Sequence, residues 1–311
     1  MVAAVPIDVN RLRKRYGSVE ALKGVSFHID RGEMFGLIGP DGAGKTTTIR
    51  LLCGLLHADE GEVRILGHDP VSSHRAITAS VGYLSQRFSL YGDLSIDENI
   101  AFFAEIHGVA DYQARRDRLL DITQLTPFRH RLADRLSGGM KQKLALACTL
   151  VHEPEVIILD EPTTGVDPVS RREFWKLLSQ FLDQGITILM STPYLDEAER
   201  CHRIALLHEG AVLALDEPGR LRGSLPGEWF EVVVDNPREA AARMTRLAGG
   251  ARPYVFGDRL HVWLDQPRAG GARGQLDAAL ASIAAAPTMV RPITPSLEDV
   301  FIAKLTGSPD S

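Results

Sequence analysis

The stretch from Gly39 to Thr47, GPDGAGKTT, limits the possible folds more than any other part of the chain. It matches the phosphate-binding loop pattern, in which Gly, four residues and Gly-Lys-Ser/Thr follow one another. The apolar residues 34–38 before it predict a strand, and residues 46–52 predict a helix. Small residues allow backbone N–H groups to turn toward phosphate oxygens at a helix start, where the helix dipole favours anions. The sequence therefore predicts a strand–loop–helix unit that binds phosphate groups.

The residues of this loop have specific expected roles. Lys45 is expected to reach the β- and γ-phosphates of a nucleotide, and the Thr46 hydroxyl to bind Mg²⁺. A chance Gly-rich turn is the alternative, but later stretches supply the missing parts of the same site. We expect the nucleotide to contact Gly39, Pro40, Asp41, Gly42, Ala43, Gly44, Lys45, Thr46 and Thr47.

A second predicted strand ends in two carboxylates. Residues 155–161, EVIILDE, are typical of a parallel strand buried on both faces. Asp160 is a candidate Mg²⁺ ligand, and Glu161 is placed to orient or deprotonate the attacking water. Buried strands seldom end in paired acids unless a cation lies nearby. Gln86, which ends the predicted strand 81–86, is a further candidate for binding Mg²⁺ and orienting water, and a surface glutamine is the alternative.

A second helix start, at Ser137-Gly138-Gly139, also suits anion binding. One nucleotide needs only one phosphate loop, so this second start indicates that two chains share each nucleotide. The alternative is an ordinary helix cap with Ser137 at the N-cap position. Tyr16 lies in a predicted turn and is a candidate for stacking on a nucleotide base. A tyrosine packed in that turn fits the sequence equally well.

Length and composition limit the remaining possibilities. A length of 311 residues predicts about two domains. The net charge of −5 gives no general reason to expect a nucleic-acid partner. The three scattered cysteines are expected to be reduced, buried thiols in a cytosolic protein. We expect no signal peptide, and no run approaches the ~18 apolar residues of a membrane span. Any membrane role would therefore require a partner.

The predicted domain boundary lies near residues 219–226 and divides the chain into residues 1–222 and 223–311. Within the first domain, the helical pattern of residues 95–125 belongs to a predicted helical subdomain at about 87–150. The second domain has the order strand-helix-strand-strand-helix-strand, which is that of a small α+β, ferredoxin-like unit. Because it has no acid cluster, metal set or nucleophile in its sequence, we expect a regulatory or interface role for it.

Taken together, these motifs resemble the ATP-binding subunits of ATP-binding-cassette (ABC) transporters over residues 5–220. Residues 136–142, LSGGMKQ, are similar to the signature of that family and carry the specific part of the match. The resemblance implies an α/β P-loop NTPase core with a helical signature subdomain, ATP and Mg²⁺ as cofactors, and ATP hydrolysis. It also assigns Tyr16 to adenine stacking, Gln86 to the lid of the site, and Asp167 to an inter-subunit loop.

A finer resemblance is to the drug-exporter type of bacterial subunit, including daunorubicin-resistance-like ATPases. Residues 39–45, 194–199 and 295–301 carry it. It implies a separately encoded integral-membrane permease (type 2) that contacts residues 86–103, and a cytoplasmic, peripheral position on the inner face of the cell membrane. The expected second partner is another ATP-binding subunit, as a homodimer or a heterodimer. DNA-repair ATPases with a related head insert coiled coils or zinc modules before the signature, and residues 47–135 contain neither.

Pro193 departs from the family pattern, because a switch histidine usually stands at this position. Proline has neither a side-chain donor nor a backbone N–H, so it cannot bridge the γ-phosphate and Glu161 as the family histidine does. His202 and His208 lie on later elements and are not expected to substitute. We therefore expect slow turnover. The alternative is a regulatory, weakly hydrolysing cassette that pairs with a second, active ATPase.

Overall fold

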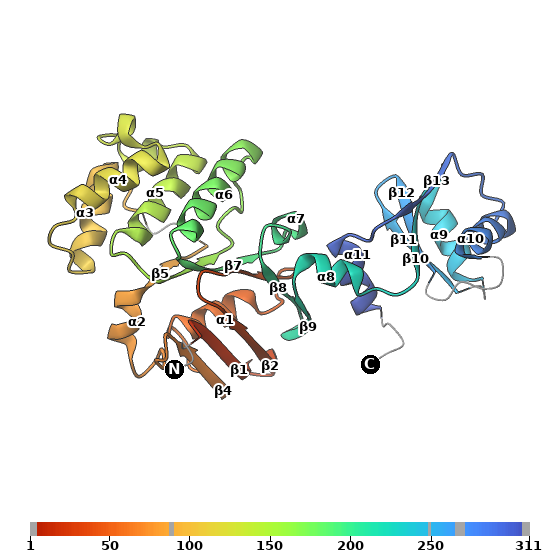
Figure 1. The fold of residues 1–311 in the computed structure, drawn as a ribbon, viewed down its shortest axis with the longest axis horizontal. Helices are drawn as coiled ribbons and strands as arrows, with labels where there is room; N and C mark the ends of the chain where they lie inside the picture. The colour runs from red at the N-terminus through yellow and green to blue at the C-terminus, as the bar shows by residue number, and fades with distance from the viewer. Residues whose placement is uncertain (1–4, 87–89, 248–249, 265–270, 307–311) are drawn as a thin grey trace. The chain divides into compact units, whose positions relative to one another are not determined.

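The computed structural model describes residues 5–86, 90–247, 250–264 and 271–306 (Figure 1). The chain forms two compact units, residues 1–217 and 218–311. The boundary between these units lies a few residues before the predicted one.

The first unit contains a six-stranded sheet in the order β5-β6-β7-β3-β8-β9. All neighbouring strands are parallel except β8 and β9, which form the predicted closing hairpin. Every residue of β3, β6 and β7 is buried, as expected for parallel strands covered on both faces. The strands are β3 (Met34–Ile38), β5 (Val81–Leu84), β6 (Val156–Asp160), β7 (Thr187–Thr192), β8 (Arg203–His208) and β9 (Ala211–Asp216).

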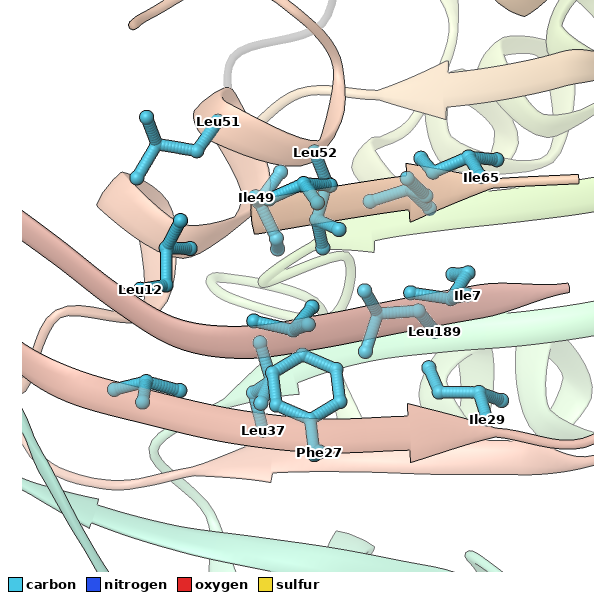
Figure 2. Packing of buried hydrophobic residues seen from close by; sticks show 14 of the residues in the cluster. Ile7, Leu12, Phe27, Ile29, Leu37, Ile49, Leu51, Leu52, Ile65 and Leu189 are labelled. Carbon is cyan, nitrogen blue, oxygen red and sulfur yellow. The ribbon is translucent and has the colours of Figure 1, made fainter. Parts of the chain in front are cut away.

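A second sheet covers the helix that follows the phosphate loop. It is antiparallel, in the order β2-β1-β4, with β1 (Ile7–Tyr16), β2 (Val19–Ile29) and β4 (Glu60–Ile65). Helix α1 (Lys45–Leu52) contacts β2 and β4 of this sheet and β6 of the other. Figure 2 shows Ile7, Phe27, Leu37, Ile49 and Leu189 in one apolar cluster between these elements. This core holds α1, and with it the loop at its start.

Helices α3 (Ile96–Ile106), α4 (Gln113–Thr123) and α5 (Gly138–Leu150) form the described part of the predicted helical subdomain. They pack on one another, and α5 also contacts β5, the edge strand of the large sheet (Figure 1). Residues 87–89 of the predicted subdomain lie outside the described residues. Two short 3₁₀ turns, η1 (Thr126–Phe128) and η2 (Ala133–Arg135), connect α4 to α5.

Four helices of the first unit differ from the sequence-based expectation. The helical pattern of residues 95–125 is split into α3 and α4, because Gly108 adopts a left-handed φ of 67° just after α3 ends. Helix α2 (His74–Ser80) was not predicted. Helix α6 (Pro168–Asp183) begins two residues before the predicted Ser170, with proline at its first position. A single turn, α7 (Leu195–Ala198), follows β7.

Residues 228–293 of the second unit have the predicted order of elements, whereas the helix at residues 218–223 was not predicted. Its antiparallel sheet runs β11-β12-β10-β13, and helices α9 and α10 pack on it over a core that includes Phe230, Val262 and Leu276. This strand order is that of the predicted ferredoxin-like unit. The elements are α8 (Pro218–Gly223), β10 (Glu228–Val233), α9 (Pro237–Thr245), β11 (Ala251–Phe256), β12 (Arg259–Leu264), α10 (Gly271–Ser282), β13 (Met289–Ile293) and α11 (Leu297–Leu305).

Within the described part of the chain, no helix has both the length and the apolar character needed to cross a lipid bilayer. The cysteines Cys53, Cys148 and Cys201 are free and buried, as predicted. Burial, with a smaller contribution from Asp160, raises the pKa of the Cys53 thiol to about 12. The thiol is therefore protonated and inert at neutral pH.

Candidate nucleotide-binding site

The phosphate loop joins the end of β3 to the start of α1 and depends on its glycines. Gly42 and Gly44 have φ values of 79° and 105°, which favour glycine. A Cβ atom on Gly44 would lie 2.7 Å from a methyl of Leu22, and one on Gly39 would collide with the carbonyl oxygen of Leu207. The loop is therefore held tightly between β2 and β8.

Lys45 at the start of α1 is buried, with 4% of its side chain exposed. Its Nζ donates hydrogen bonds to the carbonyl oxygens of Gly39 at 2.7 Å and Pro40 at 3.1 Å. It also lies 3.1 Å from Oε1 of Glu161, which follows β6. A buried ammonium group requires partners of this kind. The ion pair therefore joins the phosphate loop to the second predicted motif.

Asp160, at the end of β6, lies beside two hydroxyl groups. Thr46 Oγ1 donates to Asp160 Oδ1 at 3.2 Å, and Ser191 Oγ donates to the same oxygen at 2.7 Å. Carboxylate and hydroxyl oxygens are ligands that suit Mg²⁺, so Thr46 and Asp160 fit this ion. Ser191 was not predicted as a site residue. The feature that could have identified Ser191 is its position on β7, where it pairs in parallel register with Asp160.

The backbone of Glu161 has a left-handed φ of 49°, which is strained for a residue with a side chain. Its N–H donates to the carbonyl oxygen of Ser191 at 3.2 Å and to Ser191 Oγ at 3.0 Å. Gln86 Nε2 donates to Glu161 Oε2 at 3.1 Å, and Thr164 Oγ1 donates to the same atom at 3.4 Å. These contacts fix the Glu161 carboxylate between Lys45 and Gln86.

Most of the predicted site residues line one cavity of about 440 Å³, a volume within the usual range for small-ligand sites. Tyr16 belongs to its lining, is 46% exposed, and has the Nζ of Lys14 5.8 Å from its ring centroid. One face of its ring is therefore beside a cation. The cavity is lined by Tyr16, Ala21, Asp41, Gly42, Ala43, Gly44, Lys45, Thr46, Thr47, Gln86 and Glu161.

The predicted signature residues lie elsewhere on the chain. Helix α5 begins at Gly138, and Ser137 Oγ accepts the N–H of Met140 at 3.3 Å, as an N-cap does. Ser137 and Gly138 are exposed, whereas a Cβ atom on Gly139 would collide with the side chain of Ser170 on α6. In the described structure, the cavity lining includes none of the three predicted residues.

Asp167 and Pro193 also lie outside the cavity lining. Asp167 is the N-cap of α6, where its Oδ1 accepts the N–H groups of Val169 and Ser170, both at 3.0 Å. Hydrogen bonds from Ser170 lower the pKa of this carboxyl group. Pro193 follows β7 and has no side-chain donor. His202 Nδ1 accepts the N–H of Met34 at the far end of β3, away from the phosphate loop.

Comparisons with known proteins show which family the chain belongs to. The family model described as ABC transporter matches residues 22–164. The probable multidrug ABC transporter ATP-binding protein YbhF of Escherichia coli is 44% identical over 78% of this chain, although the match spans only 42% of that relative. The Nod factor export ATP-binding protein I of Burkholderia thailandensis is 37% identical over 98% of both chains.

The fold agrees with a solved structure of the same class. The dimeric structure of MJ0796, a bacterial ABC transporter cassette, matches with a TM-score of 0.60 and 27% identity over 68% of this chain and 98% of that one. The predicted α/β cassette fold is thus confirmed. The chain belongs to the ABC transporter family, as one of its ATP-binding subunits.

Proposed function

We propose that this chain hydrolyses ATP and thereby powers export through a separate membrane permease. The observation that carries the proposal is the cavity in which the phosphate loop, Lys45, Gln86 and Glu161 meet. Relatives named for multidrug transport and for Nod factor export support the direction of transport. The exported compound is proposed to be a drug or another small molecule.

The side chains divide the chemistry among them. The loop amides and Lys45 offset the phosphate charge. When phosphates enter the cavity, the ion pair between Lys45 and Glu161 breaks and Lys45 contacts the phosphates instead. Glu161 then accepts a proton from the attacking water, which Gln86 helps to orient. Thr46 and Asp160 are the proposed Mg²⁺ ligands. When held by these residues, the ion would supply positive charge that offsets the negative charge developing on the phosphates. Tyr16 stacks on the adenine ring.

The nucleotide is proposed to lie between two chains. Ser137 and Gly138 are exposed and do not line the nucleotide cavity of their own chain. The start of α5 is therefore available to an ATP molecule bound by a second subunit. Asp167 is assigned to the same interface. ATP favours closure because it contacts both chains, and hydrolysis removes that preference. The second subunit is a copy of this chain or a related cassette, and the dimeric MJ0796 cassette supports the first choice.

The complex is proposed to lie on the inner face of the cell membrane, where the permease contacts the segment that includes α3. Pro193 leaves two possibilities for hydrolysis. The chain hydrolyses ATP slowly, or it is a regulatory, weakly hydrolysing cassette that pairs with a second, active ATPase. The second is supported by the absence of a donor at position 193 and by the contact of His202 with Met34 instead.

ATP turnover of the purified chain tests the proposal, measured beside Glu161→Gln, Pro193→His and the exposed control Glu62→Gln. We expect turnover in the parent and in Glu62→Gln, none in Glu161→Gln, and faster turnover in Pro193→His. ATP binding without turnover in all forms would favour the regulatory cassette. A parent chain that does not bind ATP would contradict the proposal. Copurification of nucleic acid in place of a permease would contradict the transport role.

A further inference from the structure

Glu197 on α7 is a buried carboxylate that the proposed chemistry does not use. Its side chain is 1% exposed. Oε1 accepts a hydrogen bond from Thr163 Oγ1 at 2.6 Å, and Oε2 accepts one from Thr192 Oγ1 at 2.7 Å. Arg171 Nε lies 3.4 Å from Oε1, and Trp175 Nε1 donates to Oε1 at 3.5 Å. A buried carboxylate is costly unless its oxygens are satisfied, so this set of donors holds Glu197 in one place.

The two hydroxyl partners of Glu197 come from the two segments beside the proposed catalytic centre. Thr163 lies two residues after Glu161, in the loop that ends at Asp167. Thr192 is the last residue of β7, and its Oγ1 also accepts the N–H of Tyr194 at 3.1 Å. The chain on both sides of Pro193 is therefore connected to Glu197, and through it to the loop that follows Glu161.

The neighbouring acid on the same turn makes a clear contrast. Asp196 is 74% exposed, and its Oδ2 lies 3.9 Å from Arg171 Nη1. Glu197 is enclosed by α6, β7 and the loop after Glu161, whereas Asp196 faces solvent beside Arg171 of α6. Helix α7 is a single turn of four residues, so side-chain contacts must fix its position.

We propose that Glu197 is a positioning residue for ATP hydrolysis. It holds the loop from Glu161 to Asp167 against the segment around Pro193, so that Glu161 keeps its place when a partner subunit contacts Asp167. This inference rests on the proposed function of the site. Because Glu197 does not line the nucleotide cavity, its loss lowers kcat and leaves ATP affinity unchanged.

Variants of Thr163 test the contact without removing a buried charge. Thr163→Val removes the hydroxyl at nearly constant side-chain volume, whereas Thr163→Ser keeps the hydroxyl. We expect Thr163→Val to lower kcat about tenfold or more through misplacement of Glu161. Thr163→Ser is expected to stay within about twofold of the parent, and both variants are expected to bind a fluorescent ATP analogue as the parent does.

A double-mutant cycle then tests whether Thr163 acts through Glu197. Glu197→Gln is expected to lower kcat by a similar factor, and Glu197→Gln with Thr163→Val to be no slower than the slower single variant. Asp196→Asn, the exposed neighbour, serves as the matched control and is expected to keep parental kcat. If Glu197→Gln does not fold, the Thr163→Val and Thr163→Ser pair still decides the question.

The outcomes separate this inference from the proposed function. A parent that turns over ATP, with Thr163→Val at parental kcat, overturns the role of Glu197 alone. Effects of Glu197→Gln and Thr163→Val that multiply, or ATP affinity that falls in parallel with kcat, also overturn it. A parent without ATP turnover overturns the proposed function first, and the inference with it.

Discussion

Two helix starts in this chain look alike in sequence and differ in their surroundings. Both α1 and α5 begin in Gly-rich segments. The first N–H groups of a helix have no partner within the helix, and they lie at the positive end of its dipole. At α1, the ends of β6 and β7 add Asp160 and Ser191, and Lys45 is buried beside Glu161. At α5, Ser137 and Gly138 face solvent.

The difference shows that a helix start alone does not make a nucleotide site. The start of α1 lies at the carboxyl ends of parallel strands, where side chains from separate motifs meet in one cavity. Within the described residues, the start of α5 contributes nothing to the lining of this cavity. We therefore interpret α1 as one half of the site within the chain and α5 as the half offered to a partner. The following predictions test this division.

The largest effect is expected from Lys45→Ala, which removes the buried cation at α1. Among the described residues that line the cavity, Lys45 is the one with a positive charge, so phosphates would lose their main counter-charge there. We expect ATP affinity and turnover both to fall, turnover by about 100- to 1,000-fold. Titration of a fluorescent ATP analogue and steady-state turnover measure the two effects. Parental ATP affinity in this variant would contradict the assignment of the α1 half.

A selective effect is expected from Gly138→Ala at α5. Within the described residues, a Cβ atom at Gly138 meets nothing within 4 Å, so the folded chain has room for it. If a partner's ATP approaches this backbone closely, turnover falls by about tenfold while ATP binding to the single chain is unchanged. Gly274→Ala in α10 is the matched control, because its Cβ is equally free. Equal turnover in the two variants would contradict a role for the start of α5 in binding the ATP of a partner.

Ser191→Ala tests the support behind α1. The hydroxyl is fully buried and bridges Asp160 and the N–H of Glu161, so its loss removes one hydrogen bond from each. Asp160 then keeps its contact with Thr46, and the N–H of Glu161 keeps the carbonyl oxygen of Ser191. We expect the free energy of unfolding to fall by about 1–3 kcal/mol and the Mg²⁺ concentration for half-maximal turnover to rise. Denaturant unfolding and a Mg²⁺ titration measure these changes. A parental Mg²⁺ requirement would show that Ser191 supports the fold without positioning Asp160.

The far end of α5 is anchored in its own chain, and pH tests that anchor. The ring of His152 stacks on that of His107 with centroids 3.8 Å apart. Burial is the larger cause, and the charge of His107 a smaller one, that lowers the pKa of His152 to about 4. Below pH ~6.5 the unfolded chain binds a proton that the folded chain does not, so stability falls as pH drops toward 4. His152→Asn is expected to reduce this loss by about 1–2 kcal/mol, measured by unfolding at pH 7 and pH 4.5. An unchanged slope would contradict the anchor.

The strands and helices that carry the local motifs were predicted from the sequence, whereas the side chains that other strands and turns contribute beside them were not. The phosphate loop, the two acids at the end of β6 and the helix start at Ser137 each follow from a contiguous pattern. Ser191 and Glu197 depend on strand order and on the contacts of a single helical turn, which no contiguous pattern encodes. The break between α3 and α4 was also missed, because one glycine with a left-handed φ interrupts a continuous apolar pattern.

The most direct test of the shared site is ATP-dependent dimerisation of Glu161→Gln, a form expected to bind ATP without hydrolysing it. Light scattering would compare this form with the same form carrying Gly138→Ala or Gly274→Ala. We predict a dimer of two copies only when ATP is present, weakened about tenfold by Gly138→Ala and unchanged by Gly274→Ala. Dimerisation that is equally strong with Gly138→Ala would contradict the central claim. A chain that binds ATP and stays monomeric would contradict a site shared between two copies of this chain.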